Sequence, residues 1–133
     1  SLWSMRMKPD EIAAEIGERI TETEKVTAED LEATERALET YPDSVELWCL
    51  LGDLIQLSDE DSTYEFKEAE TCYIKAKEID PEDPEPYESL GFYYDSILED
   101  PAKAEPYFRK AIELGAGESA HEGLADVLAQ LRF

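Results

Sequence analysis

The sequence predicts an all-α protein made of stacked pairs of antiparallel helices. One helical pattern of apolar residues, with offsets of three, four and seven, occurs four times along the 133 residues. A small residue lies inside each copy, and these residues are 35, 39 and 34 positions apart (Gly17, Gly52, Gly91 and Ala125). A second helical pattern follows the first and ends at Pro or Gly. A fixed period of this size is typical of a stacked repeat array.

Each copy of the first pattern predicts the leading helix of a pair. Its offsets place the apolar side chains on one stripe of a helix. The Gly or Ala within the stripe allows a neighbouring helix to approach closely, although each Gly costs about 1 kcal/mol of helix propensity. Two copies are strong and two are weaker: Trp48-Leu51-Gly52-Ile55, Tyr87-Leu90-Gly91-Tyr94, Ala13-Ile16-Gly17-Ile20 and His121-Leu124-Ala125-Leu128.

The second pattern predicts the partner helix of each pair. It spaces two alanines around an aromatic residue, and the Pro or Gly after it is expected just past a helix end. Its copies are Ala69-Tyr73-Ala76 before Pro81, Ala104-Phe108-Ala111 before Gly115, and the remnant Ala37-Leu38 before Pro42. We interpret the aromatic residues of both patterns as core: Trp48, Tyr73, Tyr87, Tyr94 and Phe108.

These patterns together resemble the tetratricopeptide repeat, whose W-x2-L-G-x2-Y…A-x3-F…P sequence the central repeat matches in nearly every position. The resemblance extends from about Asp10 to about Leu131. It implies a right-handed superhelix of about seven helices, a tetratricopeptide-like α-solenoid, in a single domain at 10–131. The repeats would be 10–42, 43–81 and 84–116, with a closing helix at 118–131. We expect residues 1–9 to be a flexible N-terminus that is partly not native.

The repeats depart from the family pattern in three places. The first repeat has Ala13 where a large aromatic residue is usual, and Asp30 and Thr34 in positions usually held by Ala and Phe. The stretch 58–64 lengthens the middle repeat by five residues, and the next repeat has one extra residue near Asp100. We expect both insertions in the turn between two helices, where extra residues disturb stacking least.

Capping residues and prolines set the expected helix boundaries. Asp10 is expected to cap the first helix, which runs to about Glu22, and Thr27-x-x-Asp30 predicts a capping box. Pro106 lies inside the sixth helix, so we expect a kink or a later start there. The remaining helices are expected at 45–57 and 64–79, from near Pro86, after Asp100-Pro101, and after Glu118-Ser119.

Charge excludes several functions. Thirty-four acidic against twelve basic residues give a net charge of −22, which opposes contact with nucleic acid or with an anionic membrane. No apolar run is long enough for a membrane span, and no signal segment leads the sequence. We interpret Cys49 and Cys72 as reduced thiols of a cytoplasmic protein, since nothing in their spacing indicates a redox pair.

The inner face of the leading helices is the expected site. Of twenty residues projected onto it, ten are acidic and none is Lys or Arg. Some family members hold a chaperone's C-terminal carboxylate with Lys and Asn on this face, but a carboxylate here would meet like charge. A basic or amphipathic peptide fits better. The predicted partner contacts are Glu18, Glu46, Cys49, Asp53, Gln56, Glu85, Glu88, Phe92, Asp95, Glu122 and Asp126.

The sequence therefore predicts a non-catalytic adaptor that binds a protein or peptide partner. One alternative is a structural subunit that self-associates through the array ends, including Phe133. Another is an acidic mimic of DNA. We expect no cofactor and no metal, since Asp59-Glu60-Asp61 lacks the alternating ligands and the Gly of a calcium loop. His121 occupies the position of Trp48 and Tyr87, so we interpret it as a packed residue and predict that the chain is not an enzyme.

Overall fold

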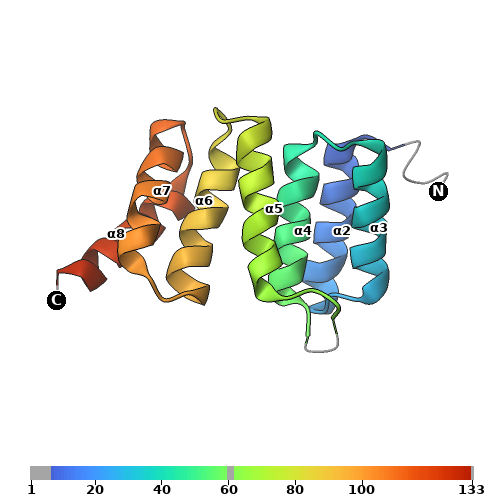
Figure 1. Ribbon diagram of the computed structural model, residues 1–133, viewed down its shortest axis with the longest axis horizontal. Coiled ribbons are helices and arrows are strands. Elements are labelled where there is room, and N and C mark those ends of the chain that lie inside the picture. Colours follow the sequence, from blue (N-terminus) through green and yellow to red (C-terminus); the bar gives the residue numbers. More distant parts are fainter. Residues whose placement is uncertain (1–6, 60–61, 133) are drawn as a thin grey trace. The chain divides into compact units, whose positions relative to one another are not determined.

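The computed structural model describes residues 7–59 and 62–132, and these ranges contain helices and no strand. The prediction of an all-α protein with seven helices is confirmed. The helices divide between two compact units, unit 1 (Ser1–Ile79) and unit 2 (Asp80–Phe133), which are described separately. The elements, traced in Figure 1, are α2 (Pro9–Thr23), α3 (Ala28–Thr40), α4 (Val45–Leu57), α5 (Phe66–Ile79), α6 (Pro84–Phe92), the π-helical η1 (Tyr93–Ile97), α7 (Pro101–Glu113) and α8 (Glu118–Leu131).

Unit 1 consists of two helix pairs, α2 with α3 and α4 with α5. Helix α4 contacts all three of the others, so its buried stripe forms the centre of the unit. Gly52 of α4 lies against the ring of Tyr73 of α5, and a Cβ at Gly52 would come within 2.6 Å of that ring. The small residue thus admits the aromatic ring, as the repeat pattern predicts.

Unit 2 contains one helix pair, α6 with α7, followed by α8. Helix α7 contacts both α6 and α8. Its Phe108 is fully buried and lies between two glycines, since a Cβ at Gly91 or at Gly123 would come within 2.8 or 2.5 Å of its ring. One aromatic residue therefore joins three helices.

The aromatic residue of the first pattern has the same role in both units. The indole N–H of Trp48 donates to the carbonyl oxygen of Pro42 at 2.8 Å, and the hydroxyl of Tyr87 donates to that of Pro81 at 2.9 Å. Each bond joins the leading helix to the turn six residues earlier. These two rings are half-buried, whereas Tyr73, Tyr94 and Phe108 belong to the core as predicted.

Several helix ends differ from the expectation. The prediction that Asp10 caps α2 is wrong: Lys8 is the cap, with its backbone N–H donating to Glu11, because Pro9 fits the first helical position, where no N–H is needed. Helix α5 starts two residues later than predicted, at Phe66, and α6 starts earlier, at Pro84. The capping box of Thr27 and Asp30 and the span of α4 are confirmed. Pro106 does not delay α7, which starts at Pro101.

The extra residue expected near Asp100 is placed differently. The turn between α6 and α7 does not hold all of it, because the end of the leading helix α6 widens into the π-helical η1. The backbone N–H of Leu98 donates to the carbonyl of Tyr93 at 3.2 Å, five residues earlier. Such a turn accommodates one inserted residue without breaking the helix, so part of the insertion lies within the helix itself.

The closing helix α8 packs through a different face from the predicted one. Its buried residues are Ala120, Gly123 and Val127. The prediction that His121 is packed is wrong, since His121 is exposed. The stripe of α8 that contains His121 corresponds to the stripe through which α4 faces α5 and to the stripe through which α6 faces α7. In the described part of unit 2, no further helix follows α8 to cover that stripe.

Candidate functional site

The predicted partner residues of unit 1 lie on α2 and α4. Glu18, Glu46 and Asp53 are exposed, and Gln56 is half-buried. Cys49 is a correction: it is fully buried among the core residues of α4, so it offers no surface to a partner. Its position was predicted from the helical projection alone, which does not include the neighbouring helices that cover it.

Two of these residues are fixed by the core of unit 1. The hydroxyl of Tyr73 donates to the carboxylate of Asp53 at 2.6 Å and accepts from the side-chain amide of Gln56 at 2.5 Å. Burial and the nearby charge of Asp53 raise the pKa of Tyr73, so the hydroxyl keeps its proton as a donor. Burial also raises the pKa of Asp53 although part of its surface is exposed, and the bond from Tyr73 opposes that rise.

In unit 2 the structure connects predicted residues of α6 and η1 to α8. The hydroxyl of Ser119 donates to Glu88 at 2.6 Å, and the side-chain amide of Gln130 donates to Asp95 at 3.0 Å. Glu88 and Asp95 are seven residues apart, and Ser119 and Gln130 are eleven apart, so each pair lies on one helical stripe. The two hydrogen bonds therefore align a stripe of α6 and η1 with a stripe of α8.

The remaining predicted residues of unit 2 lie along these two stripes. Phe92 lies between Glu88 and Asp95, is 37% exposed, and packs edge-on against Phe108 with ring centroids 4.9 Å apart. Glu122 and Asp126 are exposed on α8, and Glu85 is exposed one turn before Glu88. We call the following set the Phe92 face: Glu88, Phe92, Asp95, Ser119, Glu122, Asp126 and Gln130.

An ion pair in the first helix pair was not predicted from the sequence. Asp30 of α3 is only 2% exposed, and it pairs with Arg19 of α2. Burial alone would raise the pKa of Asp30, but hydrogen bonds from Thr27 and the guanidinium of Arg19 outweigh it and lower the pKa. The sequence signal for this pair is an acidic residue in a position where the family usually has Ala.

Metal binding and thiol reactivity are two further kinds of chemistry on which the described ranges bear. Among residues 7–59 and 62–132, no group of His, Cys, Asp and Glu side chains could hold a metal ion. Glu60 and Asp61 of the acidic turn lie outside those ranges. Burial, together with the charge of Glu68, raises the pKa of the Cys72 thiol to about 12, which disfavours the reactive thiolate. No helix of the described residues is both long and apolar enough to cross a membrane.

The helix pairs, with a glycine of one helix against an aromatic ring of the next, define a helical repeat protein. Residues 84–114, which include α6, η1 and α7, match the family model of the tetratricopeptide repeat. The chain therefore contains a tetratricopeptide repeat at these residues, as its sequence patterns predicted. No curated protein matches it significantly. The repeat indicates a protein–protein interaction scaffold in general terms, and its family is typically non-catalytic.

Proposed function

We propose that this chain is a non-catalytic adaptor whose Phe92 face binds a basic or amphipathic segment of a partner protein. The observation that carries the proposal is an exposed aromatic ring placed between carboxylates that hydrogen bonds hold in position. The ring of Phe92 supplies an apolar anchor, and interfaces depend on a few such anchors. The unit 1 residues Glu18, Glu46, Asp53 and Gln56, and Glu85 of unit 2, remain predicted partner contacts.

The charges of the Phe92 face favour a cationic partner. Four carboxylates, those of Glu88, Asp95, Glu122 and Asp126, belong to it, and no Lys or Arg does. Complementary charge at the edge of an interface accelerates association and excludes partners of the same sign. A segment that ends in a carboxylate, or one rich in acids, is therefore disfavoured here.

Peptide binding at low and moderate salt tests this function. The probe is an acetylated and amidated peptide of alternating Leu and Lys residues. Its binding is measured by fluorescence anisotropy. Glu122→Lys with Asp126→Lys leaves the hydrogen bonds of Tyr73, Ser119 and Gln130 to carboxylates in place. Reversal at Asp53, Glu88 or Asp95 would remove one of these bonds as well. We expect this double reversal to weaken binding on the order of tenfold at low salt, and less at moderate salt.

A matched control carries the same change of charge away from the Phe92 face. Glu82→Lys with Glu113→Lys alters two exposed acids of unit 2, and the affinity should change by less than about twofold. Phe92→Ala should weaken binding at both salt concentrations, because its contribution is apolar. Equal losses in the double reversal and its control would contradict the proposal.

A second candidate, self-association, has one observation in its favour. On α8, Leu124 and Leu128 are half-buried and Leu131 is 41% exposed. In the other leading helices the corresponding stripe faces a partner helix. A second copy of the chain could cover this stripe. Light scattering at high concentration checks the idea, and a monomer would argue against it. Phe133, which was also predicted to take part, lies outside the described residues.

A further inference from the structure

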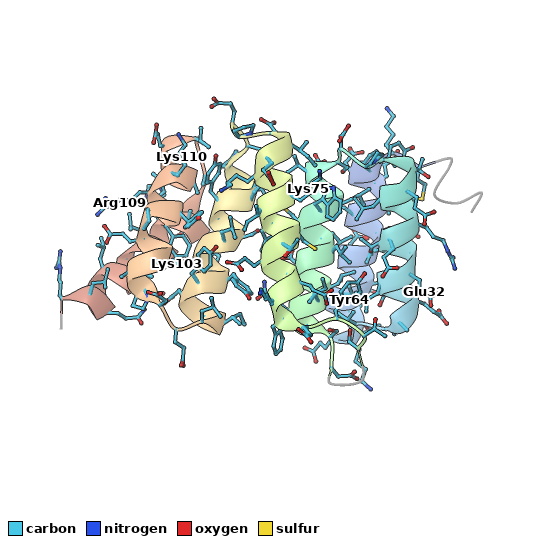
Figure 2. The ribbon with its side chains drawn as sticks, in the orientation of Figure 1. Glu32, Tyr64, Lys75, Lys103, Arg109 and Lys110 are labelled. Atoms are coloured by element: carbon cyan, nitrogen blue, oxygen red, sulfur yellow. The ribbon has the colours of Figure 1, made fainter. Side chains whose placement is uncertain are left out.

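Unit 1 has a second concave surface, at the end where α2 turns into α3 and α4 leads to α5. Two hollows of about 560 and about 480 Å³ open there, which is the size range of pockets that bind ligands. They share one wall, formed by Ser58, Asp59 and Tyr64. Figure 2 shows Tyr64 and Glu32 at this end of the unit. None of these residues was a predicted partner contact.

Apolar side chains line both hollows. Val26 and Leu31 line the first together with Tyr64, and Ile55 and Phe66 line the second. Phe66 is 55% exposed although it is a large aromatic residue. Exposed apolar residues at the edge of a hollow indicate a contact surface for another molecule. Each hollow can therefore take an apolar side chain.

The wall between the hollows is fixed by hydrogen bonds. The hydroxyl of Tyr64 donates to the carboxylate of Glu35 on α3. Burial, together with the hydrogen bond and charge of Glu35, raises the pKa of Tyr64, so this hydroxyl stays protonated. The backbone N–H of Tyr64 donates to Ser62 at 3.1 Å, and that of Glu65 donates to Glu68 at 2.7 Å. The ring of Tyr64 is thus held between α3 and the start of α5.

The lining of the hollows is acidic. Glu32, Glu35, Asp59 and Glu65 contribute four carboxylates, and Lys25 is the single cation among the lining residues. Asp59 lies in the shared wall. A cation near that wall would be attracted, and an acidic segment would be repelled.

We propose that this surface, which we call the loop-end surface, binds a partner segment that carries an apolar side chain on each side of a Lys or Arg. The two apolar side chains enter the two hollows, and the cation lies near Asp59 between them. Ser58, Asp59 and Tyr64, which belong to the stretch that lengthens the middle repeat, form the shared wall of this surface. The corresponding connection of unit 2, between Ile97 and Pro101, is shorter.

Residue-resolved NMR tests the proposal with the alternating Leu and Lys peptide as the probe. We expect the peptide to shift the methyl resonances of Val26, Leu31 and Ile55, which lie in the hollows. A peptide with Gln in place of Leu and one with Glu in place of Lys should each shift them far less. Shifts confined to the neighbourhood of Phe92 would overturn this inference while leaving the proposed function intact.

Matched variants separate a specific site from the general attraction of an acidic protein. Glu32→Lys with Asp59→Lys should weaken binding at the hollows on the order of tenfold. The control, Glu39→Lys with Glu78→Lys, makes the same change of charge at exposed positions that line neither hollow, and should weaken it by less than about twofold. Phe66→Ala should weaken binding without unfolding the protein, because the ring is mostly exposed. Equal losses in both double reversals would overturn the proposal.

Discussion

The first helix pair, α2 with α3, and the third, α6 with α7, are held together by different interactions. In the third pair Gly91 admits the ring of Phe108, so the contact is apolar and close-packed. In the first pair, no atom of the described residues outside the glycine's own stretch of helix lies within 4 Å of a Cβ placed on Gly17, and the contact includes the ion pair of Arg19 with the buried Asp30. The repeat spacing is therefore preserved where the packing that normally explains it is absent.

This difference separates two meanings of the same glycine. At Gly91 the missing side chain makes room for an aromatic ring of the partner helix. At Gly17 no neighbouring helix of the described residues fills the space of the missing side chain, so only the loss of helix propensity remains. The sequence pattern is the same at both positions, and the residue that faces the glycine decides its role.

Adding a methyl group at each glycine should give the largest effects. Gly123→Ala and Gly91→Ala should each destabilise the protein by about 1–3 kcal/mol, because Phe108 is held from both sides and cannot move away from one new methyl group without approaching the other glycine. Gly17→Ala should stabilise it by about 0.5–1 kcal/mol. Urea unfolding followed by circular dichroism measures all three, and a loss at Gly17 equal to that at Gly91 would remove the distinction.

The ion pair of the first helix pair should give the next largest effect. Arg19→Met leaves the buried carboxylate of Asp30 with Thr27 alone, and we expect a loss of about 1–3 kcal/mol, less than for a fully buried pair because Arg19 is half exposed. Glu29→Gln, an exposed neighbour in the same helix turn, is the control and should change stability by less than about 0.5 kcal/mol. Comparable losses in both variants would show that the buried pair has no special role.

The same carboxylate predicts a dependence on pH. Because the folded-state pKa of Asp30 lies below its ordinary value of 3.8, its contribution to stability is complete well above pH 3.8 and is lost as the pH falls through the folded pKa. Asp30→Asn removes this titration, so the stability difference between the natural chain and the variant should shrink toward acid pH. Dilute samples are needed, since the isoelectric point is near 4.1.

The fold could be read from the sequence because packing produces periodicity. The spacing of Gly52, Gly91, Tyr73 and Phe108 predicts which helices pair, and these residues meet as expected. Two errors about burial share one cause: a periodic pattern assigns a face to a helix, but the neighbouring helices decide which faces are covered. Cys49 became buried and His121 exposed for this reason.

The candidate site could be predicted only in part, for a related reason. Helical projection placed Glu88, Phe92 and Asp95 on one stripe, but the hydrogen bonds of Ser119 and Gln130 that align this stripe with α8 depend on the tertiary structure. The loop-end surface could not be predicted, because its hollows arise where an irregular turn meets α3. No periodicity describes an irregular turn.

Removing the hydroxyl group of Tyr73 compares the ring of Tyr73 in unit 1 with the ring of Phe108 in unit 2. Tyr73→Phe makes the ring of unit 1 resemble that of Phe108, and it removes the donor to Asp53 and the acceptor for Gln56. We expect a loss of about 1 kcal/mol and a further rise in the pKa of Asp53, which carboxyl NMR can follow. Tyr87→Phe removes the hydrogen bond from that hydroxyl to the carbonyl oxygen of Pro81, and it should leave the pKa of Asp53 unchanged. An unchanged pKa in Tyr73→Phe would contradict the assigned bond.

The smallest expected effect concerns how the leading helices of the two units end. Glu24 follows α2 with φ of 57°, and Glu99 follows η1 with φ of 52°, a conformation that favours glycine. Glu24→Gly and Glu99→Gly should therefore each stabilise the protein by about 0.5–1 kcal/mol, and Glu→Gln at each position separates the removal of charge from the relief of strain. Equal gains measured by thermal unfolding would mean that the left-handed residue costs the same after an α-helix and after a π-helical turn. A gain at Glu24 alone would mean that the wider turn of η1, whose carbonyl of Tyr94 accepts from Asp100 at 2.8 Å, holds its last residues without needing glycine.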